Sequence, residues 1–272
     1  GNMQNVVIRA IERLDFRTKE AYKTLRTNLS FAGKNVKVIS LTSCTPNEGK
    51  TSVSFQLCLS LAESGKQTIL VDADLRKSVL RGRYKANREK YGLSHYLSGQ
   101  VELDDACCRT NVNNFDIIFA GPVPPNPSEL LGGDAFRNML EVLRMKYDYV
   151  IVDTPPLGSV IDAAIVGAIC DGTVIVVESG AISYKFVQNV KEQLNKVGCR
   201  ILVLNKVNTK KNPYYGKYYG HYYGNYYGNG QDGTEETQED LTPDAGSKSD
   251  GTAAETKTAV PGQNTGEKES AK

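Results

Sequence analysis

Six short apolar runs between residues 37 and 205 constrain the fold more than any other feature of this sequence. Each run is rich in β-branched or aliphatic residues, and amphipathic segments long enough to form crossover helices separate them. Strands that are apolar throughout belong in a parallel sheet that helices cover on both faces. The pattern therefore predicts a single doubly wound α/β domain with a mainly parallel sheet. The expected strands are residues 37–42, 68–73, 115–120, 149–153, 173–178 and 201–205.

The amphipathic segments predict helices on both sides of this sheet. They lie at residues 50–64, 134–146, 161–170 and 183–197. A further helix is expected ahead of the first strand, at residues 18–31, where an apolar stripe runs beside a charged stripe of Glu20, Lys23 and Arg26. Such a helix usually packs on its own sheet. The charged stripe could also pair with a neighbouring subunit, and both interpretations stay open.

The net charge of +2 combines two unlike parts of the chain. Residues 229–272 hold ten acidic and four basic residues, a net charge of −6, so residues 1–228 carry +8. Leu241 and Val260 are the only large aliphatic side chains in that final stretch, too few to offset the entropy lost on ordering it. We therefore expect an acidic disordered tail. The basic remainder could suit phosphate-bearing ligands, nucleic acid or an anionic membrane surface.

Eight of the fifteen tyrosines fall within the tyrosine cluster, which we define as residues 212–228. Tyrosine pairs alternate there with a glycine and one polar residue, so neither a stable helix nor a core is expected. Such a flexible segment could be a low-complexity linker or a stacking platform for single-stranded nucleic acid. Against the second interpretation, Lys217 is the single lysine or arginine within the repeat. The tyrosines are Tyr214, Tyr215, Tyr218, Tyr219, Tyr222, Tyr223, Tyr226 and Tyr227.

Other features narrow the class of protein. The six cysteines show no CxxC spacing, and His95 and His221 are the only histidines, which argues against a thiolate metal site. No apolar run reaches the roughly 18 to 20 residues that span a bilayer, and the amino end lacks the apolar segment of a signal peptide. We therefore expect a cytoplasmic chain. Its expected parts are an N-terminal helical segment, an α/β domain, the tyrosine cluster and the acidic tail, at residues 1–35, 36–211, 212–228 and 229–272.

Residues 43–52, SCTPNEGKTS, follow the first expected strand and open a helix, which is the context of a phosphate-binding loop. In such a loop the backbone N–H groups and the helix amino terminus face the phosphates. Lys50 is expected to reach the β- and γ-phosphates, and the Thr51 hydroxyl to bind a magnesium ion. Cys44 replaces the first glycine of the usual pattern, yet an ordinary strand-to-helix turn explains the Gly-Lys-Thr core less well. The expected nucleotide-binding residues are Thr45, Pro46, Asn47, Glu48, Gly49, Lys50, Thr51 and Ser52.

Carboxylates mark the ends of two further expected strands. Asp72 and Asp74 lie at the end of the second strand, and Asp153 closes the fourth. Ligands of doubly wound sheets bind at the carboxyl ends of strands, where Mg²⁺ would offset the repulsion between carboxylates. Asp74 could instead cap the following turn. Together with the phosphate loop these residues predict a nucleotide site in a sheet of the P-loop NTPase type, with Thr51, Asp74 and Asp153 around the metal.

With these motifs, the chain resembles the bacterial tyrosine kinase family of capsule and exopolysaccharide systems. The resemblance covers residues 17–228 and rests on Gly49-Lys50-Thr51, the DxDxR spacing from Asp72, Asp153-Thr154-Pro155-Pro156, the PPNPSELL of residues 124–131, the N-terminal helix and the tyrosine cluster. It implies a kinase that uses ATP and Mg²⁺ to phosphorylate the tyrosine cluster of a neighbouring subunit. Asp72 would accept the phenol proton. The implied catalytic residues are Lys50, Asp72, Asp74 and Asp153.

The resemblance also implies partners. A transmembrane activator of the polysaccharide chain-length type would complete the ATP site and recruit the chain to the inner face of the cell membrane. The chain would assemble with copies of itself, in a homo-oligomer that could be a ring, through Glu20, Lys23 and Arg26, and would act on protein tyrosines rather than nucleic acid. Lys23 stands where the family carries an arginine, so a forked contact with a carboxylate is lost there.

Two other functions fit parts of the sequence. A ParA- or MinD-like ATPase shares the expected fold, but those proteins carry an additional lysine at the position of Thr45 and lack a tyrosine repeat. A scaffold that binds nucleotide only to gate its assembly is the second alternative. In all three cases Asn205, at the end of the last expected strand, could bind the adenine ring or simply complete a turn.

Overall fold

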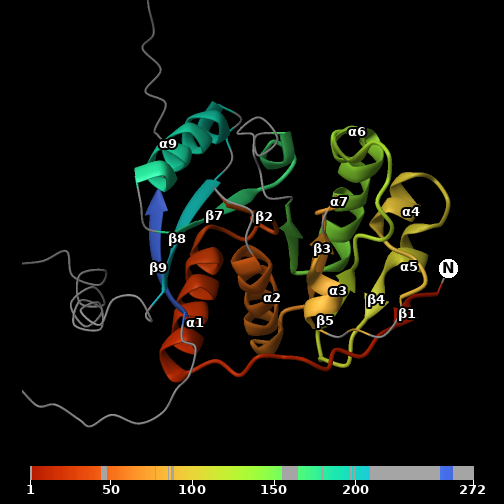
Figure 1. Ribbon diagram of the computed structural model, residues 1–272, viewed down its shortest axis with the longest axis horizontal. Coiled ribbons are helices and arrows are strands. Elements are labelled where there is room, and N and C mark those ends of the chain that lie inside the picture. The colour runs from red at the N-terminus through yellow and green to blue at the C-terminus, as the bar shows by residue number, and fades with distance from the viewer. Residues whose placement is uncertain are drawn as a thin grey trace, which may run out of the picture.

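The structure is a computed structural model in which one twisted sheet runs through the centre of the α/β domain (Figure 1). In the described part of the chain the strand order is β1-β4-β5-β3-β6-β2-β7-β8-β9. The description covers residues 2–43, 48–76, 78–84, 86, 89–154, 165–178, 181–196, 198, 200–208 and 252–259.

The six expected strands are confirmed and form the parallel centre of the sheet. Every residue of β2, β3 and β6 is buried, so both faces of these strands are covered. Burial on both faces explains why their sequences show no alternation of polar and apolar residues. These strands are β2 (Val38–Ser43), β3 (Thr68–Asp72), β5 (Phe115–Ile118), β6 (Tyr149–Asp153), β7 (Gly172–Glu178) and β8 (Arg200–Asn208).

Helices cover both faces of the sheet, as a doubly wound fold requires. The first core cluster joins α1 (Phe16–Phe31) and α2 (Glu48–Glu63) to one face. The second joins α7 (Asp134–Lys146) to the other face, where α9 (Ala181–Lys196) packs against β7 and β8. Of the helix expected at residues 161–170, only 165–170 are described, and 165–167 are helical.

Several short elements escape sequence patterns because they are too brief to show a period. β1 (Gln4–Asn5) pairs with β4 (Cys108–Arg109), which runs antiparallel to β5. The remaining elements are single helical turns or little more. They are α3 (Leu80–Arg83), α4 (Leu93–Leu97), α5 (Leu103–Ala106) and α6 (Pro127–Leu131).

Within the tail expected at residues 229–272, the structure describes one strand. β9 (Thr252–Ala259) pairs antiparallel with β8 along its length and lies beside α1 (Figure 1). Without β9, β8 would form the edge of the sheet and present unpaired backbone groups, and threonine suits an extended strand. Backbone hydrogen bonding to β8 therefore positions β9, whose sequence has no large apolar side chain to bury. The other tail residues lie outside the described ranges.

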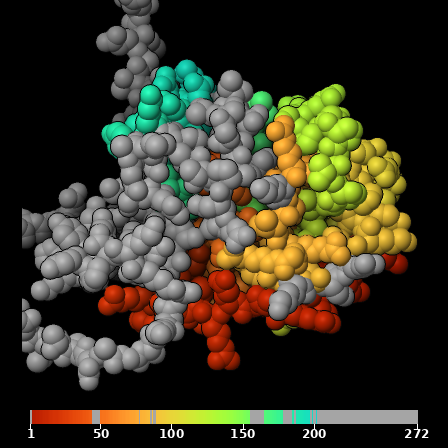
Figure 2. Space-filling model, viewed as in Figure 1, coloured from red at the N-terminus to blue at the C-terminus, as the bar shows by residue number. Residues whose placement is uncertain are grey.

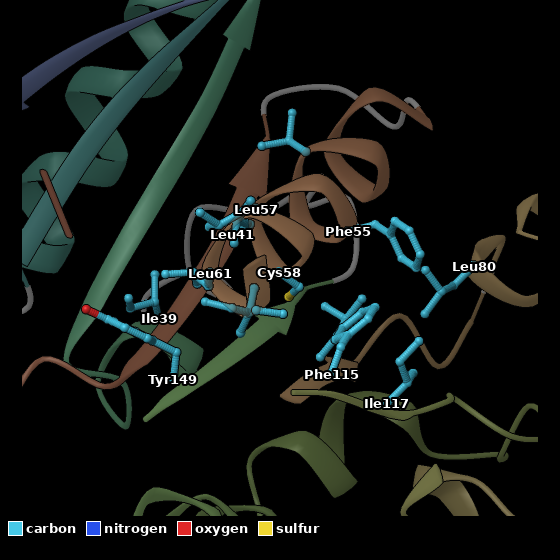
Figure 3. Packing of buried hydrophobic residues seen from close by; sticks show 14 of the residues in the cluster. Ile39, Leu41, Phe55, Leu57, Cys58, Leu61, Leu80, Phe115, Ile117 and Tyr149 are labelled. Atoms are coloured by element: carbon cyan, nitrogen blue, oxygen red, sulfur yellow. The ribbon is translucent and has the colours of Figure 1, made fainter. Parts of the chain in front are cut away.

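Aromatic side chains of the first core cluster contact one another beside α2 (Figure 3). Phe55 points from α2 toward Leu80 and contacts the ring of Phe115 edge-on, with 5.4 Å between ring centroids. Its other face stacks on Tyr84 at 3.6 Å, and all three rings are buried. This packing fixes α2, and with it the residues at the start of that helix, against β5 and α3.

A partly buried ion pair at the amino ends of β2 and β7 gives a stability prediction. Asp171 accepts hydrogen bonds from the backbone N–H groups of Lys37 and Val38, at 2.9 and 2.8 Å, and from the Arg144 guanidinium at 2.7 Å. Asp171→Ala removes the side-chain acceptor of both backbone N–H groups, while Arg144 keeps Glu141 and the carbonyl of Asn35. We expect the substitution to lower the free energy of unfolding by about 2–3 kcal/mol in urea denaturation. Asp104→Ala, which removes an exposed ion pair with Lys146, should cost about 0–1 kcal/mol. Equal losses in the two variants would contradict the capping role of Asp171.

Candidate active site

The candidate active site lies where three neighbouring parallel strands end. β3, β6 and β2 are adjacent in the sheet, with Asp72 paired to Asp153 across β3 and β6, and Leu41 paired to Asp153 across β2 and β6. The N–H group of Ala73 donates to the carbonyl of Asp153 at 2.9 Å, which holds the two strand ends together. α2 begins at Glu48, five residues after β2 ends. The order of the strands therefore gathers motifs that are about a hundred residues apart.

Asp153 is held by three side chains of α2. Its Oδ1 atom accepts hydrogen bonds from the Lys50 ammonium and, at 3.1 Å, from Ser54, while Oδ2 accepts one from the Thr51 hydroxyl at 2.9 Å. Lys50 is 2% exposed and Asp153 1% exposed. A buried charge requires such partners because burial without them costs several kcal/mol. The structure thus brings Lys50 and Thr51 of the expected phosphate loop together with the carboxylate of β6.

Asp72 forms the second half of the site. Its Oδ1 atom accepts the N–H group of Asp74 at 3.1 Å, and its Oδ2 atom accepts the hydroxyl of Ser78. Burial and then the negative charge of Asp153 hold the pKa of Asp72 well above its usual range, while the hydrogen bonds from Ser78 and Asp74 act in the opposite direction. A carboxylate with a raised pKa is a better proton acceptor than an exposed aspartate.

The donor set suits a magnesium nucleotide. Mg²⁺ binds oxygen ligands and commonly uses one or two carboxylates together with phosphate oxygens. A hydroxyl and a carboxylate oxygen already lie together at Thr51 and Asp153. Asp74 follows β3, the strand next to β6, and its backbone N–H group donates to Asp72. Among the described residues no three His, Cys, Asp or Glu side chains gather as a self-sufficient metal site. The site therefore fits a cation that takes its remaining ligands from phosphate and water.

The structure describes some predicted site residues only by their backbone, and others lie outside the described ranges. The structure describes the backbone of Glu48 and Gly49 in the first turn of α2, and that of Asn205 in β8, but not their side chains. Whether Asn205 contacts a nucleotide stays a prediction. The residues outside the described ranges are Thr45, Pro46, Asn47 and the eight tyrosines of the tyrosine cluster.

The charged stripe of α1 makes contacts within its own subunit. Arg26 donates to the carbonyl of Ser60 on α2 at 2.6 Å, and Lys23 forms an exposed ion pair with Glu20 at 3.1 Å. The apolar stripe, with Tyr22 and Leu25, is buried in the core. The helix thus packs on its own sheet, and its role between subunits stays a prediction.

Two site residues were missed by the sequence reasoning. Ser54 follows Lys50 by four residues, so helical spacing alone could have placed it beside the lysine. Ser78 follows Asp72 by six residues in an irregular segment, and nothing in its spacing indicates the contact. Arg76 also leaves the site to bond the hydroxyl of Ser128 at 2.8 Å, which joins the DxDxR segment to α6.

The fold and site define a P-loop nucleotide-binding protein. A family model described as "AAA domain" matches residues 36–206. The chain is 44% identical over 200 residues to the tyrosine-protein kinase CpsD of Streptococcus agalactiae, covering 73% of this chain and 87% of the relative. It is 34% identical to the tyrosine-protein kinase YwqD of Bacillus subtilis, with 79% of this chain and 92% of YwqD covered.

Solved structures agree with these relatives. The kinase domain of the Escherichia coli tyrosine kinase ETK matches with a TM-score of 0.62 and 38% identity, over 67% of this chain and 72% of that domain. The chimerical protein CapA2B2 matches with a TM-score of 0.64 and 31% identity, over 74% and 93% of the two chains. The chain belongs to the bacterial tyrosine-protein kinase family.

The family resemblance drawn from the motifs is therefore confirmed. A MinD structure from Pyrococcus horikoshii, in complex with Mg-ADP, is a more distant match, with 25% identity and a TM-score of 0.52 over 61% of this chain and 67% of that protein. In the described residues no helix is both long and apolar enough to cross a membrane.

Proposed function

We propose that this chain is an ATP-dependent protein-tyrosine kinase that phosphorylates the tyrosine cluster of a neighbouring subunit. The observation that carries the proposal is the meeting of Lys50, Asp153 and Asp72 at the ends of β2, β6 and β3, in a chain of the tyrosine-protein kinase family. The tyrosine cluster supplies eight acceptors in one short stretch of the same chain. Membership of the family also motivates a role in capsule or exopolysaccharide synthesis.

Some residues of the site stabilise negative charge, and another accepts a proton. Lys50 and the amino end of α2 stabilise negative charge on the transferring phosphoryl group. Thr51, Asp153 and Asp74 are the residues suited to hold Mg²⁺, which when bound neutralises charge on the phosphate oxygens. The Mg-ADP complex of the MinD relative supports the same choice of ligand.

Asp72 takes the proton of the acceptor. The tyrosine oxygen forms a bond to the γ-phosphorus of ATP while the bond from that phosphorus to the ADP oxygen breaks, and the phenol proton passes to Asp72. Phosphotyrosine, ADP and a protonated Asp72 result. The low exposure of Asp72, 1%, keeps this proton acceptor away from bulk water.

The partners follow from the same proposal. A transmembrane activator would complete the ATP site and bring the chain to the inner face of the membrane, and Glu20, Lys23 and Arg26 would contribute to contacts between subunits. Lys23 and Glu20 are exposed enough, at 42% and 41% of their side chains, to exchange their mutual ion pair for one with another copy. Exposed pairs are worth at most about 1 kcal/mol, so such an exchange is inexpensive.

Mixing two complementary variants tests transfer between subunits. One chain has all eight tyrosines of the cluster replaced by phenylalanine and keeps its active site, and the other carries Lys50→Met and keeps its tyrosines. With Mg-ATP, we expect phosphate on the Lys50→Met chain, mapped to the tyrosine cluster by mass spectrometry. Neither chain should gain phosphate there when incubated alone.

The controls separate two other outcomes. Wild-type chain that hydrolyses ATP steadily without gaining phosphate would favour the ATPase alternative over the kinase. Wild-type chain that labels itself, beside a mixture that shows no labelling, would retain the kinase and overturn transfer between subunits.

A further inference from the structure

Ser78 occupies the solvent side of the buried carboxylate of Asp72. It follows β3 in the segment that leads to α3, and it is exposed, whereas Asp72 is 1% exposed. Its hydroxyl donates to Oδ2 of Asp72. In Figure 2 the orange residues that follow β3 form part of the surface seen there, beside the α6 and α7 residues. An acceptor that approaches Asp72 from the side of this segment therefore meets Ser78.

The two oxygens of Asp72 are held from different directions. The backbone N–H group of Asp74 fixes Oδ1 at 3.1 Å, and the Ser78 hydroxyl fixes Oδ2. The terminal torsion of an aspartate is otherwise broad, so these two bonds restrict the plane of the carboxylate. A carboxylate offers about four lone-pair sites, which leaves Oδ2 able to accept one further hydrogen bond.

The segment that carries Ser78 is itself anchored. Arg76, two residues earlier, bonds Ser128 of α6 at 2.8 Å, and Leu80, two residues later, is buried in the first core cluster. The hydroxyl of Ser78 is thus delivered to Asp72 by a segment with a fixed contact on each side. A loop tethered in this way can hold a catalytic group to the accuracy that transfer reactions require.

We propose that Ser78 is a positioning residue for phosphoryl transfer, whose hydroxyl holds the Asp72 carboxylate so that Oδ2 faces the phenol of the acceptor tyrosine. The inference rests on the proposed kinase function. The phenol proton passes to Asp72 as before, and Ser78 gains and loses no proton overall. In the alternative role, the same contact is inhibitory. A serine hydroxyl that occupied the position of the phenol would slow the reaction, and its removal would raise the rate.

Two substitutions of nearly equal shape isolate the hydroxyl. In the chain whose eight cluster tyrosines are phenylalanine, Ser78→Thr keeps a hydroxyl and Ser78→Val replaces it with a methyl group. With Mg-ATP and a peptide of residues 212–228 as acceptor, we expect Ser78→Val and Ser78→Ala to lower kcat about tenfold, because misplaced catalytic groups cost rate. The KM for ATP should change less than about twofold, since the phosphate loop is untouched.

Ser78→Thr should stay within about threefold of the parent kcat, and Ser98→Ala, at the exposed serine that follows α4, should match the parent. Calorimetric binding of Mg-ATP and the thermal unfolding curve check that each variant is folded. A Ser78→Val kcat equal to or above that of Ser78→Thr would overturn the positioning role. A parent chain that binds Mg-ATP but labels no peptide and no wild-type chain would instead contradict the proposed function.

Discussion

Lys50→Met is expected to lower the rate of tyrosine phosphorylation at least about a hundredfold, because removing one preorganised charge partner of a transition state costs that much in other enzymes. Methionine has a similar length and apolar stem but no charge. In the structure the Lys50 ammonium is buried against Asp153, so the charge is held in place before the phosphates arrive. Intact-mass spectrometry of the full chain with Mg-ATP, sampled over time, measures the phosphates gained.

The matched control is Lys19→Met. Lys19 forms an ion pair with Glu63 at the end of α2, at 3.8 Å, and its side chain is 53% exposed. Lys19→Met should leave the phosphorylation rate unaltered, since an exposed ion pair contributes little to stability. Thr51 and Ser54 still donate to Asp153 in the Lys50→Met chain, so its circular dichroism should remain that of a folded protein. Phosphate gain at the wild-type rate in Lys50→Met would remove the basis for the catalytic assignment.

Phe55→Ala is expected to lower the free energy of unfolding by about 3–5 kcal/mol, the usual cost of deleting a buried phenylalanine. Phe55 is 0% exposed, stacks on Tyr84 and contacts Phe115 edge-on, so neither neighbour can fill the cavity without leaving its own contacts. Urea denaturation followed by circular dichroism measures the change. Because Phe55 lies in α2, one turn after Lys50, we also expect weaker binding of Mg-ATP.

Phe31→Ala provides the comparison for that experiment. Phe31 ends α1 and is 75% exposed, so the identical substitution should change stability by no more than about 0.5 kcal/mol. A similar loss in the two variants would show that the aromatic cluster does not anchor α2. Low protein concentration keeps contacts between subunits from contributing to the Phe31→Ala result.

The central strands were predictable because their composition reflects burial on both faces. β6 begins and ends at the expected residues, 149 and 153, and β3 differs from expectation by one residue. The edge elements were not predictable. β1 and β4 have two residues each, and the pairing of β9 depends on the backbone that β8 presents rather than on apolar side chains.

The candidate site also has features that the sequence could predict and features that it could not. Lys50, Thr51, Asp72 and Asp153 could be selected from the sequence because each lies at the junction of a strand and the following segment, where ligands of such sheets bind. The sequence could not show that Asp153 accepts from both Lys50 and Thr51, since these contacts span over a hundred residues. Nor could it show Ser78 against Asp72, because an irregular segment has no fixed direction for its side chains.

By itself, the sequence determined the class of fold, the phosphate loop and the carboxylates, since strand burial, the Gly-Lys-Thr core and strand-end aspartates are local patterns. Only the tertiary structure decided which groups meet. Strand order places β6 between β3 and β2, which brings Asp153 to Lys50 on one side and Asp72 on the other. That order depends on the packing of helices on both faces of the sheet, a property of the whole chain that no short stretch of sequence contains.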